Sequence, residues 1–226
     1  MKRRQFTTAA LGMGVAGLSA RAWAALGEAD AAAGVRAALE RGAEAAVSSL
    51  GRPDGFLGNP TVRIALPGAL ANAAKLLKAA GQQHKVDELV TAMNRAAEAA
   101  VPKARLLLVK TAKAMSVEDA LQIVRGSEVA VTDFFVRKTR EPLTEQFLPI
   151  VAQSTQRVAL AAKFNAVAGQ AAKLGLLKPQ DADIDRYVTG KALDGLYLMI
   201  AEEERRIRRD PIGSGSAILK KVFGTN

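Results

Sequence analysis

The chain has 226 residues, which is enough for one domain to bury a substantial hydrophobic core. It contains no cysteine, so disulfide bonds, thiolate catalysis and zinc–cysteine sites are excluded. Lysine and arginine number 32 against 22 acidic residues, a formal net charge of +10. That excess alone does not define a class of partner, because part of it lies at the very start of the chain.

Residues 1–24 have the pattern of a cleavable export leader. A basic start containing Arg3, Arg4 and Phe6 precedes a short run of small and apolar residues, and Ala22-Trp23-Ala24 fits a cleavage site. The arginine pair resembles the twin-arginine signal, which exports proteins already folded, and an ordinary secretory leader is the alternative. The run is too short and too rich in glycine for a good transmembrane helix. We therefore expect a signal peptide and a periplasmic location.

The remainder, residues 25–226, is expected to form a single domain. Cleavage removes four basic residues and no acid, so the charge of this part is 28 − 22 = +6. A balance this small, with aromatic residues at only 4% of the chain, argues against nucleic acid binding. It is compatible with at most peripheral contact with an anionic membrane surface.

Helical periodicity and helix-ending residues predict most elements in chain order. Gly51 and Gly81 end the first two helices, and Ser116 begins a helix with a pattern close to a capping box. Pro102 is expected to kink or split the long helix that contains it. The predicted helices cover residues 25–50, 69–80, 85–115, 116–126, 127–137, 139–174, 187–209 and 217–223.

One long segment, Gly51–Pro67, contains three prolines and three glycines and is not expected to be helical. Within it Val62, Ile64 and Leu66 alternate with less apolar neighbours, which predicts an extended and half-buried stretch. Phe56 adds to an apolar content that is too high for a segment left in water. We expect this loop to wrap the core.

The helix over Tyr187–Arg209 is apolar around nearly its whole circumference, which is typical of a buried helix. Lys191 and Asp194 interrupt it and a charged run ends it, so it is not a membrane span. Because strand signals are nearly absent, we predict an all-α fold. The expected architecture is a single irregular bundle of about seven to nine helices around this buried central helix.

Several motifs carry a family resemblance across nearly all of residues 25–226. They are MNRAAEAAVPKA (93–104), FLPIVAQS (147–154), YVTGKALDGLYLMIAEEERRIR (187–208) and LKKVFG (219–224), together with the DGF…NP…LP pattern of the loop. The chain resembles an exported proteobacterial family catalogued as domain of unknown function 4197. The resemblance implies an all-helical periplasmic domain with no established reaction.

Two charged pairs are the candidate site residues. Lys191 and Asp194 lie three positions apart and therefore share a helix face. They form either a catalytic or ligand-binding pair in an apolar setting, or a buried or half-buried ion pair that fixes helix register. Arg95 and Glu98 have the same spacing, and either join an interhelical polar network or face solvent.

No cofactor or metal is expected. Di-iron sites in helical bundles need two Glu-x-x-His motifs, and the single histidine, His84, is predicted to be an exposed residue at a helix start. Haem, zinc and Ser-His-Asp chemistry are disfavoured for the same reason.

Three functions remain open at this point. The first is a binding module for an envelope partner or apolar ligand, using the Phe56–Leu66 loop and the Ile218–Phe223 tail. The second is a metal-independent hydrolase or lyase using Asp194, Lys191 and Glu98. The third is a purely structural envelope protein. A cleft in which Asp194, Lys191 and Glu98 converge would favour the enzyme, and a continuous apolar groove would favour the binding module.

Overall fold

The computed structural model describes residues 16–158, 161–162, 164–165, 173 and 183–210. Every described element is helical, and no strand occurs in these ranges. The elements are α1 (Ala16–Leu50), α2 (Gly68–Ala79), α3 (Gln83–Ala100), the 3-10 turn η1 (Val101–Lys103), α4 (Ala104–Lys113), α5 (Val117–Arg125), α6 (Ala130–Thr155) and α8 (Ile184–Arg209). The all-α prediction is confirmed, and the expected total of seven to nine helices stays a prediction for the whole chain.

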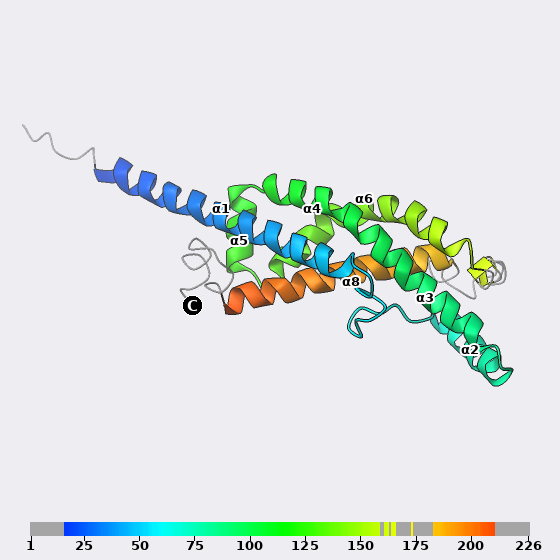
Figure 1. The fold of residues 1–226 in the computed structure, drawn as a ribbon. Coiled ribbons are helices and arrows are strands. Elements are labelled where there is room, and N and C mark those ends of the chain that lie inside the picture. The colour runs from blue at the N-terminus through cyan, green and yellow to red at the C-terminus, as the bar shows by residue number, and fades with distance from the viewer. Residues whose placement is uncertain (1–15, 159–160, 163, 166–172, 174–182, 211–226) are drawn as a thin grey trace, which may run out of the picture.

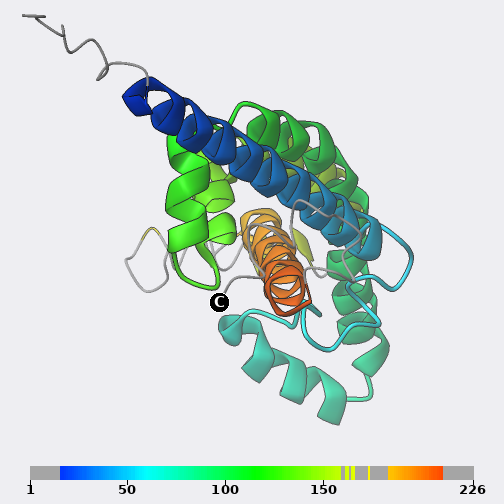
Figure 2. The same ribbon diagram turned by 90° about the vertical axis from the view of Figure 1, so that its left-hand side faces the viewer.

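The helices form an elongated bundle (Figure 1). Viewed along its length, α8 lies in the middle, with α1, α5 and α6 around it and α2 set apart at one edge (Figure 2). Helices α1, α3 and α6 all pack against α8. The first turns of α1 extend beyond the other helices (Figure 1). They include residues 16–24 of the predicted leader, and the predicted tail helix over 217–223 lies outside the described residues.

A continuous apolar core runs through the bundle. Its largest fully buried side chains come from α1, α3, α4, α6, α8 and the loop between α1 and α2: Leu39, Leu50, Phe56, Ile64, Leu89, Met93, Leu108, Phe135, Leu143, Phe147, Ile184 and Leu193. The periodic apolar positions of the sequence therefore share one interior, which is the expected result for amphipathic helices in a single domain.

Several predicted helix boundaries are confirmed, and each has a local cause. Leu50 ends α1 directly before Gly51, and Gly81 has a φ of 73° beyond the end of α2. Pro102 separates α3 from α4 through the turn η1. Ser116 forms a complete capping box with Asp119 at the start of α5.

Two predicted boundaries are wrong. The break expected between the helices 127–137 and 139–174 is absent, because one helix runs from Ala130 to Thr155 with Pro142 and Pro149 inside it. This helix then ends at Thr155 instead of continuing without a break. Each proline leaves one carbonyl without its helical partner, and the residues that carry these carbonyls, Lys138 and Glu145, are exposed. Water can hydrogen-bond these carbonyls, so the helix continues through both prolines.

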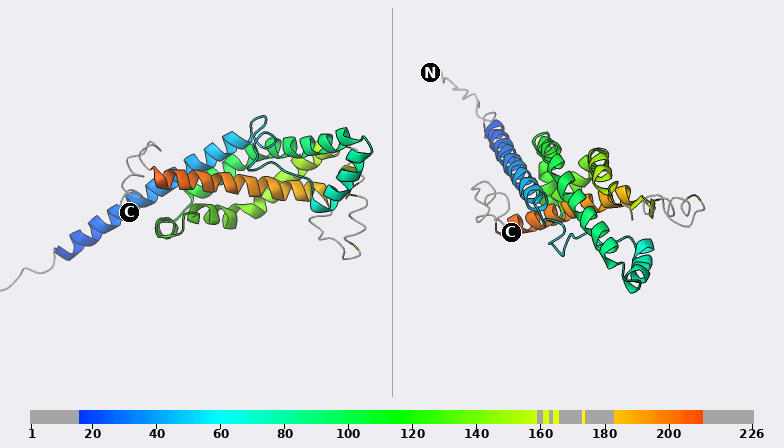
Figure 3. Two further views of the ribbon diagram at one scale, coloured as in Figure 1. Left: turned by 90° about the horizontal axis from the view of Figure 1, so that it is seen from below. Right: turned by 45° about the vertical axis from the view of Figure 1, so that its right-hand side comes forward.

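The expected burial of α8 needs a partial correction. Ile184, Val188, Leu196 and other apolar residues are buried, but Lys191, Asp194, Leu198 and Glu202 are exposed along one stripe. Seen from below, α8 lies in front of the other helices along this side (Figure 3). The helix is central without being enclosed: among the described residues, the loop and Arg140 of α6 cover part of this face.

Within the described ranges, no helix combines the length and apolar character needed to cross a membrane.

Candidate binding cleft between the loop and α8

The loop Gly51–Pro67 crosses the bundle between α1 and α2, and its apolar residues point inward. Phe56 is fully buried, Val62 and Ile64 are buried, and the alternating residues Arg63 and Ala65 are exposed. This alternation is that of an extended chain with one buried face. The prediction that the loop wraps the core is confirmed.

Glu98 of α3 fixes the first half of the loop. Its Oε1 accepts hydrogen bonds from the backbone N–H groups of Phe56 (3.0 Å) and Leu57 (3.1 Å), and its Oε2 accepts one from Arg95 (2.6 Å). Arg95 also contacts Asp54 at 2.8 Å. Hydrogen bonds to Glu98 and then to Asp54 raise the pKa of Arg95. Both carboxylate oxygens of Glu98 are therefore committed to holding the loop.

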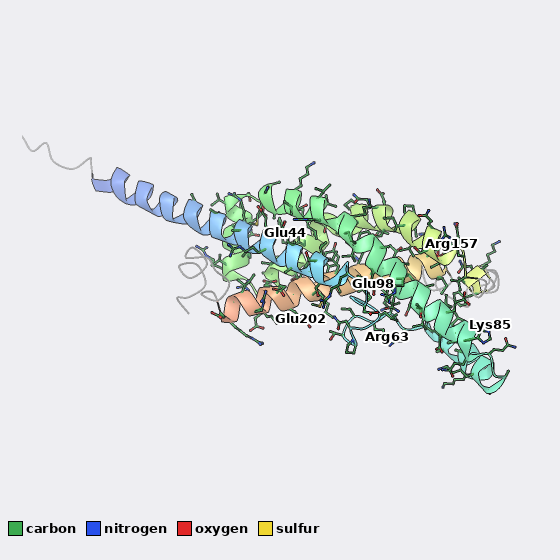
Figure 4. All side chains as sticks on the ribbon, in the orientation of Figure 1. Glu44, Arg63, Lys85, Glu98, Arg157 and Glu202 are labelled. Carbon is green, nitrogen blue, oxygen red and sulfur yellow. The ribbon has the colours of Figure 1, made fainter. Side chains whose placement is uncertain are left out.

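Asn94, one turn earlier on α3, fixes the second half. Its carboxamide accepts a hydrogen bond from the backbone N–H of Ile64 (2.8 Å) and donates to the C=O of the same residue (2.9 Å). A neighbouring β-strand would exchange the same two hydrogen bonds with the backbone of Ile64. The backbone groups of Ile64 thus face α3. In Figure 4, Glu98 lies where α3 passes the loop, and Arg63 lies on the loop itself, nearer the edge of the molecule.

α8 supports the loop from the opposite side. Gly195 allows the ring of Phe56 to approach closely, because a Cβ on this glycine would lie 2.8 Å from Phe56 Cε1 and 3.3 Å from Val62 Cβ. Tyr187 donates a hydrogen bond from its hydroxyl to the C=O of Ala65 (3.0 Å).

An open cleft of about 330 Å³ lies between the outer side of the loop and α8. Its size is at the lower end of the range for small-molecule sites. One wall is backbone and side chains of the loop, and the other is a single face of α8. The lining residues are Thr61, Val62, Arg63, Ile64, Ala65, Tyr187, Lys191, Asp194, Gly195 and Leu198.

Lys191 and Asp194 form the expected pair, with Nζ and Oδ2 3.7 Å apart, but each side chain is 49% exposed. The apolar setting that a catalytic pair requires is absent, since this face of α8 is open. Asp194 also receives a 2.7 Å hydrogen bond from Arg140 of α6. Lys191 lies over the ring of Tyr187, with 5.9 Å between Nζ and the ring centroid.

The two candidate pairs do not form one site. Arg95 and Glu98 hold the inner side of the loop, whereas Lys191 and Asp194 line the cleft on its outer side. Within the described part of the chain, no hydrogen bond or ion pair joins Glu98 or Arg95 to either residue on α8. His84 is exposed, as predicted, and no acidic or histidine cluster among the described residues has the composition of a metal site.

Sequence reasoning missed three contributors to the site. From the sequence, Asn94 is not singled out, Arg140 is not linked to Asp194, and the backbone of the loop is not treated as a wall. The alternation of Val62, Ile64 and Leu66 was the available signal for that wall, because an extended segment always presents backbone groups along two edges.

The fold and the site together define an all-helical domain that holds an irregular loop against its central helix and leaves a solvent-open cleft beside it. The chain matches the model of the family described as "Protein of unknown function (DUF4197)" over residues 25–224, and it belongs to that family. The family expected from the sequence motifs is therefore confirmed. No curated protein and no solved structure matches the chain.

Proposed function

We propose that this protein is a binding module of the bacterial envelope, and that its ligand or partner occupies the cleft between Thr61–Ala65 and α8. The observation that carries the proposal is the cleft itself. It combines exposed charges from Arg63 and Lys191 with an exposed leucine, Leu198, in one concave surface. Binding sites commonly combine apolar contact with a few polar groups in this way.

The arrangement of charges favours a binding function over hydrolase or lyase activity. Asp194 accepts contacts from two cations, and Glu98 holds loop backbone on the other side of the loop. A general base must reach the proton that it removes, and a nucleophile needs such a base within hydrogen-bond reach. Glu98 does not line the cleft, and Asp194 is already shared between Lys191 and Arg140. An enzyme built on Asp194, Lys191 and Glu98 is thus the weaker alternative.

Native mass spectrometry of protein purified from periplasm tests the proposal. We expect additional mass or a defined partner on the wild-type protein, and loss of it in Leu198→Glu, whose new charge lies in the cleft. Leu106→Glu is the matched control, because Leu106 is 84% exposed on α4 and does not line the cleft. Bare wild-type protein, or equal retention by both variants, would contradict the proposed use of this cleft and favour a purely structural role.

A periplasmic location is part of the same proposal. Two observations support it: the leader pattern around Arg3 and Arg4, and a family match that begins at Ala25, directly after the proposed cleavage site. Replacement of both arginines by lysine should leave uncleaved precursor in the cytoplasm, as judged by fractionation and immunoblotting. Continued export of the double variant in a strain without the twin-arginine translocase would rule out this route.

A further inference from the structure

The outer edge of the loop has backbone hydrogen-bonding groups that no described residue uses. Asn94 engages the N–H and C=O of Ile64 on the inner edge. In an extended chain the groups of the two adjacent residues, Arg63 and Ala65, face the opposite edge. The Arg63 N–H bonds the C=O of Asn59, and the Ala65 C=O accepts from Tyr187. The Arg63 C=O and the Ala65 N–H have no hydrogen-bond partner among the described residues.

These two groups have the spacing that a parallel strand uses. In a parallel ladder, each residue of the incoming strand lies opposite one residue of the edge strand. Its N–H donates to the C=O of the edge residue that precedes this opposite residue, and its C=O accepts from the N–H of the edge residue that follows it. Centred on Ile64, those groups are the Arg63 C=O and the Ala65 N–H. The edge therefore presents one complete parallel pairing position on the wall of the cleft.

The charge of the cleft selects among extended peptides. Arg140 contacts Asp194 at 2.7 Å and offsets its charge, while Lys191 lies farther from that carboxylate, at 3.7 Å. Arg63 is exposed and forms no ion pair within the described part of the chain. Arg63 and Lys191 thus leave a positive balance on the two walls, and Leu198 adds an exposed apolar contact.

We propose that the cleft binds an extended acidic peptide segment of a partner protein, which adds as a parallel strand beside Arg63–Ala65 and places a carboxylate between Arg63 and Lys191. This inference rests on the proposed function and specifies its ligand. Strand addition of this kind takes its affinity from main-chain hydrogen bonds and its selectivity from the side chains along the groove.

The test uses the full mature protein and a blocked peptide of alternating valine and glutamate. Hydrogen exchange at the Ala65 amide of the wild-type protein is followed by NMR as the peptide is added. We expect this amide to become protected, because the peptide accepts its hydrogen bond. The same peptide with lysine in place of glutamate should bind about tenfold more weakly, as should a version whose central amide is N-methylated.

Substitutions address the same contacts from the protein side. Ala65→Pro removes the N–H that the strand requires, and Ala65→Ser keeps it, so only the proline variant should lose about tenfold in peptide affinity. Arg63→Gln should weaken binding of the glutamate peptide and leave that of the lysine peptide unchanged or stronger. Arg52→Gln is its control, since Arg52 is exposed on the same loop but does not line the cleft.

The exchange measurement on unaltered protein decides the outcome even if Ala65→Pro does not fold. Saturating peptide without protection of the Ala65 amide, or equal affinity for the glutamate and lysine peptides, would overturn strand addition. If native protein nevertheless carries a ligand that Leu198→Glu loses, the proposed function survives and only the peptide inference fails. Absence of both would remove the proposed function as well.

Discussion

The carboxylate of Glu98 accepts two backbone N–H groups of the loop and one guanidinium N–H while the residue is only 5% exposed. Glu98→Ala should therefore leave the buried Phe56 N–H without a partner, at a cost of about 1–3 kcal/mol in the free energy of unfolding. Arg95→Gln removes a half-exposed partner of the same carboxylate and should cost less, because solvent screens this contact. Urea unfolding of the two variants measures the difference, and equal costs would contradict the role of Glu98.

Tyr197 illustrates how a buried hydroxyl produces a pH dependence. Its hydroxyl lies 2.8 Å from that of Thr139, and burial, partly offset by this hydrogen bond, raises the pKa of Tyr197. The folded state therefore holds the phenolic proton more tightly than the unfolded chain. The stability that this provides is complete below the unfolded pKa of about 10 and is lost as pH rises toward the folded pKa.

Tyr197→Phe should consequently cost about 1 kcal/mol at neutral pH, where one net hydrogen bond is lost. Thr139 keeps its bond to the Phe135 carbonyl, so its hydroxyl is not stranded. Above pH about 10 the gap between variant and wild type should close, because phenylalanine has no proton to lose. Denaturant unfolding across this range is the measurement, and a constant gap would contradict the assignment.

At the scale of elements, α8 and the loop are fitted to each other at Gly195. Gly195→Ala brings a Cβ within 2.8 Å of the fully buried Phe56 ring, so we expect a loss of about 1–3 kcal/mol from overpacking. Gly190→Ala is the matched control on the same helix, because nothing lies within 4 Å of its Cβ position. It should gain about 0.5–1 kcal/mol from helix propensity. Thermal unfolding of both variants measures these changes in stability, and a loss of stability in Gly190→Ala would contradict the explanation.

Elements whose cause is local were predictable from the sequence. Gly51, Pro102 and Ser116 act through the backbone within a few residues, and the helix boundaries that they set agree with the structure. Continuity across Thr139 was not predictable, because it depends on whether the carbonyls freed by Pro142 and Pro149 face water. That property is decided by how α6 packs on the rest of the bundle.

The candidate site was predictable only in its parts. The spacing of Lys191 and Asp194 predicted their ion pair, which the structure contains, but their exposure depends on which face of α8 the loop leaves open. The partners of Glu98 and Asn94 lie on the loop, 42 and 30 residues away in sequence, and the helical pattern of α3 does not indicate them. Long-range hydrogen bonds to loop backbone leave no local signature in the sequence.

At the scale of the whole molecule, a second buried glutamate joins three helices at the other end of α8. Glu204 accepts hydrogen bonds from the backbone N–H groups of Val131 (3.0 Å) and Thr132 (3.1 Å), which belong to the first turn of α6. It therefore caps that helix through tertiary contact, where the N-terminal dipole also favours a negative charge. Arg208 completes the connection, pairing with Glu204 at 3.0 Å and donating to the Ile123 carbonyl of α5 at 3.1 Å.

Glu204→Ala should lower the free energy of unfolding by about 1–3 kcal/mol, because it leaves two buried N–H groups in the first turn of α6 without their hydrogen-bond acceptor. Glu203→Ala is the control one residue away, where the partner Arg206 is largely exposed and the expected cost is about 0.5 kcal/mol. Since Glu204 connects α5, α6 and α8, hydrogen exchange should accelerate throughout these helices in Glu204→Ala. Acceleration confined to the first turn of α6, with the unfolding midpoint unchanged, would instead limit Glu204 to a local cap.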